Sequence, residues 1–328
     1  MMEFKNFQEY IKEHIKEMMP KEYQDAEYVL NEIPKSNGRL LHGLNMWSKD
    51  ASVSSVIYLD PYYQAYGNGT GLTVILEDIA DTIKESIPVQ KEIESMEKDI
   101  KDFGKMRDKV VMAVINYEKS KEMLNGAPYT RKEDLAVIYK ALPLYPDISP
   151  EVTVTNGLMK EWGTDVRELH ELAVENSKRM LPASADKLLD VIKSYLPQED
   201  MLYDLIPKEV LESLDIKMYV ITNQKNRYGA AAVFYDESLL YGLSEKMGGS
   251  FYLLPSSTED MIAFPENEKK ISELAGMVRY VNETEVPEEK WLSDHVYRYD
   301  AKTRQISLAD AKELQREEEE IIRPRRSR

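Results

Sequence analysis

The residues best suited to chemistry are polar side chains at two turns in the C-terminal half of the chain. Ser256, Ser257 and Glu259 follow one hydrophobic run, and Asn223 follows another. If both turns belong to hairpins of one sheet, the four side chains meet and form a hydrolase-like catalytic site from common polar residues. The alternative is that the hydroxyls hydrogen-bond to the local backbone, as is usual in tight turns. No strained G-x-S-x-G turn surrounds either serine, which favours the alternative.

The sequence lacks metal and cofactor motifs. The chain has no cysteine, and His14, His42, His170 and His295 lie in separate elements without an H-E-x-x-H pair. Three glycines within Gly67–Gly71 precede a predicted helix, a place where backbone amides bind phosphate. Their spacing matches neither the dinucleotide pattern nor a P-loop, so a turn with positive φ explains them better. We therefore expect no cofactor and no metal.

Tyrosine dominates the aromatic residues, with 21 Tyr against 6 Phe. Tyr62 and Tyr66 belong to one aromatic cluster, Trp291 to another, and Trp162 to a third segment. Because these side chains combine an apolar ring with a polar group, they suit either the edge of a core or a partner surface. The core edge is the commoner case. The alternative predicts that these four residues form an interface with another protein.

The charge and the hydropathy of the chain exclude several settings. The formal net charge is −16, from 59 acidic and 43 basic residues, which disfavours binding to nucleic acid or to anionic membranes. Charged residues interrupt the first twenty positions, so no signal-peptide core is present. The longest uncharged apolar runs fall far short of the ~20 residues of a membrane span. We expect a cytoplasmic protein.

Helices and short strands would position these residues. In the N-terminal region, a 3.6-residue period predicts helices, and runs rich in Val, Ile and Tyr predict strands. The predicted helices are 7–18, Leu72–Ser86, Val89–Lys109 with an interruption near Gly104, and Asp165–Leu181. The predicted strands are Glu27–Ile33, Leu40–Trp47, Val53–Leu59, Val110–Tyr117, Asp134–Leu142 and Glu151–Thr155.

The C-terminal region predicts two hairpins, each followed by a helix. The first hairpin pairs Met218–Thr222 with Gly229–Tyr235, and the second pairs Phe251–Leu254 with Met261–Phe264. The helices are Glu237–Met247 and Lys269–Val281. This ββαββα order indicates antiparallel pairing rather than a parallel Rossmann sheet. The predicted fold class is α+β, with antiparallel sheets flanked by helices.

The length of 328 residues favours two domains. Three prolines within Pro182–Pro207, around one short predicted helix at Ala185–Leu196, mark the junction. We expect an α+β region over residues 1–196, the ββαββα region over 197–307, and a charged, flexible tail over 308–328. The tail is solvated in one interpretation and a partner-docking peptide in the other.

Two stretches share the order strand, short aromatic helix, glycine and long helix. They are Ser54–Ser86 and Glu151–Leu181, with Tyr66-Gly67 and Trp162-Gly163 in equivalent places. One interpretation is an internal duplication, and the other is that such units resemble each other by chance.

Several segments together resemble a known family. They are Ser54–Tyr63, Ile115–Leu124, Asp134–Tyr139, Ile221–Asn223, Tyr228–Ala231 and Phe251–Ser257. Over roughly residues 1–300 the chain resembles a family of unknown function from Firmicutes, frequent in gut clostridia and often found near mobile elements. The resemblance implies a bacterial cytoplasmic setting and an accessory role on mobile DNA. It gives no residue a role.

Three functional hypotheses remain open from the sequence. The first is a non-enzymatic interaction or accessory protein whose partner is another protein. The second is an enzyme built on the polar turn residues, and the third is an acidic DNA mimic of the antirestriction type. The acidic residues are interleaved with lysines rather than arranged in lines, which weakens the third hypothesis. The sequence leaves the oligomeric state open.

Overall fold

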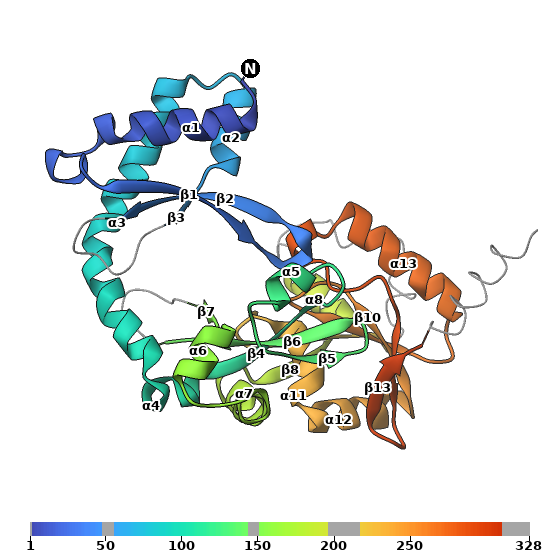
Figure 1. Ribbon diagram of the computed structural model, residues 1–328. Coiled ribbons are helices and arrows are strands. Elements are labelled where there is room, and N and C mark those ends of the chain that lie inside the picture. The colour runs from blue at the N-terminus through green and yellow to red at the C-terminus, as the bar shows by residue number, and fades with distance from the viewer. Residues whose placement is uncertain (1, 48–55, 144–150, 196–216, 310–328) are drawn as a thin grey trace, which may run out of the picture. The chain divides into compact units, whose positions relative to one another are not determined.

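The computed structural model of the chain describes residues 2–47, 56–143, 151–195 and 217–309. The chain divides into two units, Met1–Met106 and Arg107–Arg328. Among the described residues, the first unit has one antiparallel sheet and the second has two, with helices packed on them (Figure 1). The predicted α+β class with antiparallel sheets is therefore confirmed. The predicted domain junction at 196 falls outside the described residues, and so does the tail predicted over 308–328, except for Leu308 and Ala309.

The first unit is built on a three-stranded sheet in the order β1-β2-β3. Its elements are α1 (Phe4–His14), β1 (Glu27–Pro34), β2 (Leu40–Trp47), β3 (Val56–Tyr58), α2 (Asp60–Gly67), α3 (Leu72–Lys101) and α4 (Phe103–Met106). Helix α1 lies along one face of this sheet (Figure 1). Phe7 and Ile11 of α1 are fully buried there, in a core shared with Leu44 of β2 and Ile79 of α3. The turn between β1 and β2 uses left-handed backbone at Asn37 and Gly38.

Helix α3 is longer than the sequence predicted. The two predicted helical stretches that meet near Pro88 form one continuous helix from Leu72 to Lys101. The break predicted near Gly104 lies at Asp102, where the backbone becomes extended (φ −84°, ψ 102°).

The second unit contains a four-stranded sheet in the order β4-β6-β5, with β7 paired to β6. Its strands are β4 (Val110–Asn116), β5 (Tyr129–Lys132), β6 (Leu135–Ala141) and β7 (Val152–Thr153), and the helices beside it are α5 (Lys121–Leu124), α6 (Asn156–Glu161) and α7 (Val166–Met180). Every residue of β4 is buried, which explains the unbroken apolar run from Val110 to Ile115. Helix α7 packs on β4, and the Ser177 hydroxyl accepts a hydrogen bond from the backbone N–H of Met112 (2.9 Å).

The second unit also contains a six-stranded antiparallel sheet in the order β13-β12-β10-β11-β9-β8. The strands are β8 (Ala183–Lys187), β9 (Tyr219–Asn223), β10 (Phe251–Pro255), β11 (Met261–Pro265), β12 (Tyr297–Asp300) and β13 (Gln305–Leu308). The helical elements are α8 (Leu188–Tyr195), η5 (Gly229–Ala231), α11 (Ala232–Tyr235), α12 (Glu237–Met247), α13 (Ile271–Thr284) and η6 (Glu288–Lys290). Helices α13 and α12 lie on opposite sides of this sheet (Figure 1).

The first predicted hairpin of the C-terminal region is wrong. Residues Gly229–Tyr235 form η5 and α11 instead of a strand, and β9 pairs with β8 and β11. The three consecutive alanines, Ala230 to Ala232, have high helical propensity and are fully buried against the sheet. Strand β8 was itself predicted as the start of a helix. The predicted second hairpin, β10–β11, is confirmed.

The order strand, short helix and long helix occurs twice, as β3-α2-α3 and as β7-α6-α7. The two long helices differ in length, with 30 residues in α3 and 15 in α7. The internal duplication stays a prediction.

Candidate functional site

A cleft of about 950 Å³ lies on one face of the six-stranded sheet, over β8, β9 and β11. Val220 of β9 and Ile262 of β11 are register partners and form its apolar floor. Leu188 and Val191 of α8 add an apolar wall. Because side chains alternate along a strand, Val220 and Thr222 face the cleft while Ile221 is buried on the opposite face.

Strand β8 supplies two polar side chains to the same face. Ser184 is the register partner of Thr222, and Asp186 is the register partner of Val220. Partners in an antiparallel pair project to the same side of the sheet, so all four line the cleft. Asp186 is exposed and lies at the open side.

The turn between β10 and β11 closes one end of the cleft with Ser256, Glu259 and Asp260. A hydrogen bond of 2.8 Å from the Thr222 hydroxyl to the carbonyl oxygen of Glu259 ties this turn to β9. Lys290, from η6, completes the lining on this side.

Three of the four residues predicted for an enzymatic site meet at this cleft. Asn223, Ser256 and Glu259 all line it, because the two turns that carry them belong to neighbouring strands of one sheet. Ser257 does not line the cleft. Its hydroxyl accepts a hydrogen bond of 3.0 Å from the backbone N–H of Glu259, which is the local bonding of a tight turn.

Asn223 has a structural task in this arrangement. Its side chain is 1% exposed, and its Oδ1 accepts a hydrogen bond from the backbone N–H of Lys225 (3.0 Å). Its Nδ2 donates to the carbonyl oxygen of Arg227 (2.7 Å). The side chain therefore holds the loop after β9 and has little capacity left for a ligand.

Glu259 is also largely committed to the protein itself. Its Oε2 accepts a hydrogen bond of 3.1 Å from the backbone N–H of Tyr228, a residue with left-handed backbone (φ 54°). Its Oε1 lies 4.0 Å from the Lys290 ammonium. These contacts fix the carboxylate between the loop after β9 and η6.

Asp260 is the carboxylate in the cleft that has a buried oxygen, Oδ1, without a hydrogen-bond partner among the described residues. Burial raises the pKa of Asp260, while the Ser256 hydroxyl and the Lys290 ammonium act in the opposite direction. A carboxyl group with a raised pKa in a cleft is a typical proton acceptor or ligand contact.

Sequence patterns alone did not identify Asp260, Lys290 or Asp186. Asp260 stands beside Glu259 at the same turn, so its neighbourhood was identified but the residue was not. Lys290 reaches the cleft from η6, which is distant in sequence. Asp186 falls within the helix predicted at Ala185–Leu196. The two-residue alternation of a strand, which puts its side chain on the cleft face of the sheet, was therefore not applied to it.

The four aromatic residues predicted as an interface pack against the protein's own elements. Tyr62 and Tyr66 are half-buried at the core of the first unit, where the Tyr66 ring stacks on Phe7. Trp162 is 7% exposed. The indole N–H of Trp291 donates to the carbonyl oxygen of Val286 (2.7 Å). A partner surface at these residues stays a prediction.

The first unit holds a hollow of about 500 Å³ beside α1, β1 and β2, lined in part by His42. The imidazole Nδ1 of His42 lies 3.0 Å from Oδ1 of Asp60, and the backbone N–H of His42 donates to Oδ2 of the same carboxylate (2.9 Å). Asp60 is the first residue of α2, so this pair joins β2 to α2. The His42 ring also packs edge-on against Phe4.

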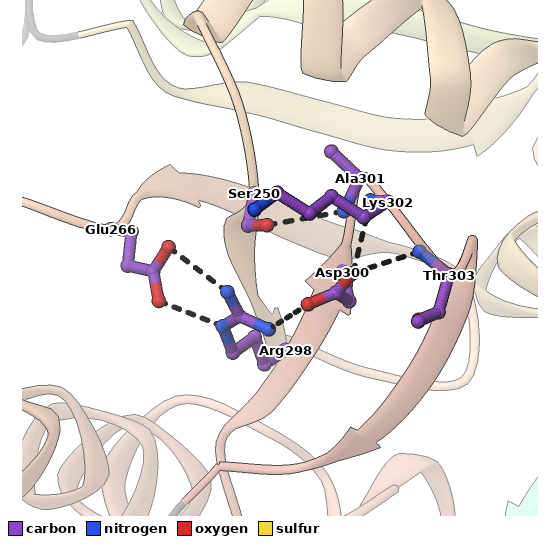
Figure 2. Close-up of polar contacts among 7 residues, drawn as sticks. All are labelled: Ser250, Glu266, Arg298, Asp300, Ala301, Lys302 and Thr303. Carbon is purple, nitrogen blue, oxygen red and sulfur yellow. Dashed lines mark hydrogen bonds and ion pairs between the residues drawn. The ribbon is translucent and has the colours of Figure 1, made fainter.

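An ion cluster on β12 is shown in Figure 2. The Arg298 guanidinium bonds to both carboxylate oxygens of Glu266 (2.7 and 3.4 Å) and to Asp300 (2.6 Å). Asp300 in turn accepts hydrogen bonds from the backbone N–H groups of Lys302 and Thr303. The cluster carries one net negative charge, but its hydrogen-bonding groups are engaged with one another and with the β12–β13 turn, which it stabilises.

Among the described residues, no group of three or more His, Asp or Glu side chains is arranged to hold a metal ion. In the same part of the chain, no helix combines the length and apolar character needed to cross a bilayer.

The fold and the cleft define an α+β protein with antiparallel sheets and a polar cleft over an apolar floor. The chain belongs to a family of unknown function, DUF5688, whose profile matches residues 4–301. Neither the comparison with curated proteins nor that with solved structures gives a match.

Proposed function

We propose that this protein binds a small polar molecule in the cleft over β8, β9 and β11. The observation that carries the proposal is the convergence of Asp186, Ser256 and Asp260 on a cleft of about 950 Å³ with an apolar floor. Sites for small molecules generally combine apolar walls with a few polar groups that fix orientation. Asp260 supplies a carboxylate that lines the cleft and has one buried oxygen without a hydrogen-bond partner among the described residues.

A reaction at this site is the second candidate. The raised pKa of Asp260, caused by burial, suits a general base, and the Ser256 hydroxyl acts on the same carboxyl. None of the described residues that line the cleft is a histidine, so a Ser–His pair does not support the hydrolase version. Acid–base chemistry through Asp260 is the form of catalysis that the geometry favours.

The interaction hypothesis from the sequence receives less support. Its four aromatic residues have intramolecular packing or hydrogen bonds that explain their positions. The accessory role on mobile DNA rests on the family resemblance alone, and the cleft adds nothing to it.

The proposal is tested by thermal denaturation of the full chain against a panel of small amines, alcohols, sugars, nucleosides and carboxylates. We expect at least one compound to raise the Tm of the wild-type protein, because a ligand that binds only the folded state stabilises it. The same compound should raise the Tm of Asp260→Asn much less.

The matched control is Asp190→Asn. Asp190 is an exposed aspartate on α8, close in sequence to Asp186 but not among the residues that line the cleft. It should respond to the compound like the wild-type protein. A compound that stabilises Asp260→Asn and the wild-type protein equally binds elsewhere and contradicts the proposal.

A further inference from the structure

The charged groups of the cleft are unequal in number. Three carboxylates, from Asp186, Glu259 and Asp260, face a single ammonium group, from Lys290, among the described lining residues. Lys290 lies 4.0 Å from Glu259, so these two groups largely compensate each other. The carboxylates of Asp186 and Asp260 are left as the excess negative charge of the cleft.

The hydrogen bonding of Asp260 provides an independent observation. Oδ1 of this carboxylate is buried and has no hydrogen-bond partner among the described residues. An unpaired buried acceptor is unfavourable, and a bonded donor relieves that cost. A change of side-chain rotamer at Asp260, which is only half-buried, would bring this oxygen into the cleft, where a donor group of a ligand can bond to it.

The remaining lining limits the shape of the ligand. Val220 and Ile262 form an apolar floor on the sheet, and Leu188 and Val191 form an apolar wall. A ligand that fits therefore has an apolar body, which contacts the floor, and a polar end near Ser256 and the β10–β11 turn.

We infer that the ligand of this cleft is an amine, a small molecule with an apolar body and a cationic ammonium group that binds between Asp260 and Asp186. This inference rests on the proposed binding function and names the class of its ligand. An ammonium group donates up to three hydrogen bonds, which suits the Asp260 carboxylate, one oxygen of which lacks a partner among the described residues. The net charge of −16 adds a long-range attraction for cations.

The test uses three probes of similar shape and different charge: benzylamine, benzyl alcohol and benzoate. Their affinities for the full chain are measured by calorimetry at one pH and ionic strength. We expect benzylamine to bind at least about tenfold more tightly than benzyl alcohol, because one additional charge interaction at close range has about this effect. Benzoate should bind most weakly.

Two kinds of variant separate charge from shape. Asp260→Asn and Asp186→Asn should each weaken benzylamine binding, by about tenfold for the less exposed Asp260 and by less for the exposed Asp186. Lys290→Gln should strengthen it by about threefold, because the competing cation is removed. A role of Lys290 in folding alone would not produce tighter binding. Asp190→Asn again serves as the control with unchanged affinity.

Each outcome decides the inference. Suppose that benzyl alcohol or benzoate binds as tightly as benzylamine and loses the same affinity in Asp260→Asn. The ligand class is then wrong, while the proposed binding function stands. If none of the three probes and no compound of the wider panel binds, both the ligand class and the binding function are wrong. Weaker benzylamine binding in Lys290→Gln also overturns the inference.

Discussion

Gly229 shows how a single residue determines the geometry beside the cleft. A Cβ atom at this position would lie 2.0 Å from the carbonyl oxygen of Glu259 and 2.2 Å from the Thr222 hydroxyl. Real Cβ atoms do not approach other atoms so closely. The hydrogen bond between Thr222 and Glu259, which joins β9 to the β10–β11 turn, therefore requires glycine at residue 229.

We predict that Gly229→Ala lowers the free energy of unfolding by about 3 kcal/mol or more, because the clash involves backbone that cannot rotate away. The measurement is chemical denaturation of the full chain. Gly242→Ala is the matched control, since a Cβ on Gly242 in α12 meets no atom within 4 Å. It should be neutral or stabilising by up to about 1 kcal/mol. Equal effects of the two substitutions would contradict the described packing.

Asp300 gives a prediction about pH. The Arg298 guanidinium, together with backbone N–H groups of the turn, holds the pKa of Asp300 well below its usual range. A carboxyl whose pKa is lowered in the folded state contributes stability above the pKa of the unfolded chain, about 3.9, and this contribution is lost as the pH falls.

We therefore expect Asp300→Asn to reduce the Tm at pH 7 and to have a progressively smaller effect as the pH falls below about 4. Thermal denaturation of the variant and the wild-type protein over this pH range checks the difference. Asp190→Asn, at an exposed site outside the cluster, should show little difference at any pH. An effect of Asp300→Asn that grows at low pH would be incompatible with the ion cluster in Figure 2.

At the scale of elements, the two sheets of the second unit are joined by a polar network. Asp134 lies in the turn between β5 and β6, and its carboxylate accepts hydrogen bonds from the Tyr297 hydroxyl and from the Ser293 hydroxyl (2.6 Å). Asn116 of β4 donates to the carbonyl oxygen of Leu292 in the same segment (3.0 Å). These bonds connect the four-stranded sheet to the segment that leads into β12.

Two tyrosines of β12 provide a matched pair for this network. Tyr297 and Tyr299 are both buried, but the Tyr299 hydroxyl has no hydrogen-bond partner among the described residues. We predict that Tyr297→Phe lowers the free energy of unfolding by about 1.5–3 kcal/mol, because a hydrogen bond to a charged acceptor is lost. Tyr299→Phe should be neutral or stabilising. Urea denaturation of both variants tests this, and the reverse order would refute the network.

The success of the sequence-based predictions also varies from element to element. The bounds of α12, Glu237–Met247, were predicted correctly because both ends carry local signals. Asp236 accepts a hydrogen bond from the backbone N–H of Leu239, and Gly248 has left-handed backbone. Residues Gly229–Tyr235 carry no such signal, and their aromatic and β-branched side chains suggested a strand. Strand β5 (Tyr129–Lys132) is short and polar, and it was not predicted at all.

At the scale of the whole molecule, the sequence predicted which turns of the cleft come together but not its chemistry. The antiparallel order of β9 and β11 brings Asn223 and Ser256 to one place, although only the second of the two predicted hairpins forms. The residues with capacity left for a ligand are others, chiefly Asp260 with Asp186. Which polar groups are already bonded depends on contacts such as that between Tyr228 and Glu259, and these are set by tertiary packing.

The net charge of −16 acquires a more specific meaning from this cleft. In the sequence it indicated only a protein that repels phosphate and anionic membranes. In the structure, part of the negative charge lines a cleft with an apolar floor. The proposed ligand site therefore lies in the second unit, at the face of the six-stranded sheet that carries α8.

The most direct test of this account is a methyl NMR titration of the full chain with the panel compound that raises the Tm most. Val220, Ile262, Leu188 and Val191 line the cleft and carry methyl groups that report on it. We expect their resonances to shift together, and those of the exposed Val74 in the first unit to stay unchanged. Shifts confined to other methyl groups, or the same shifts in Asp260→Asn, would contradict the account.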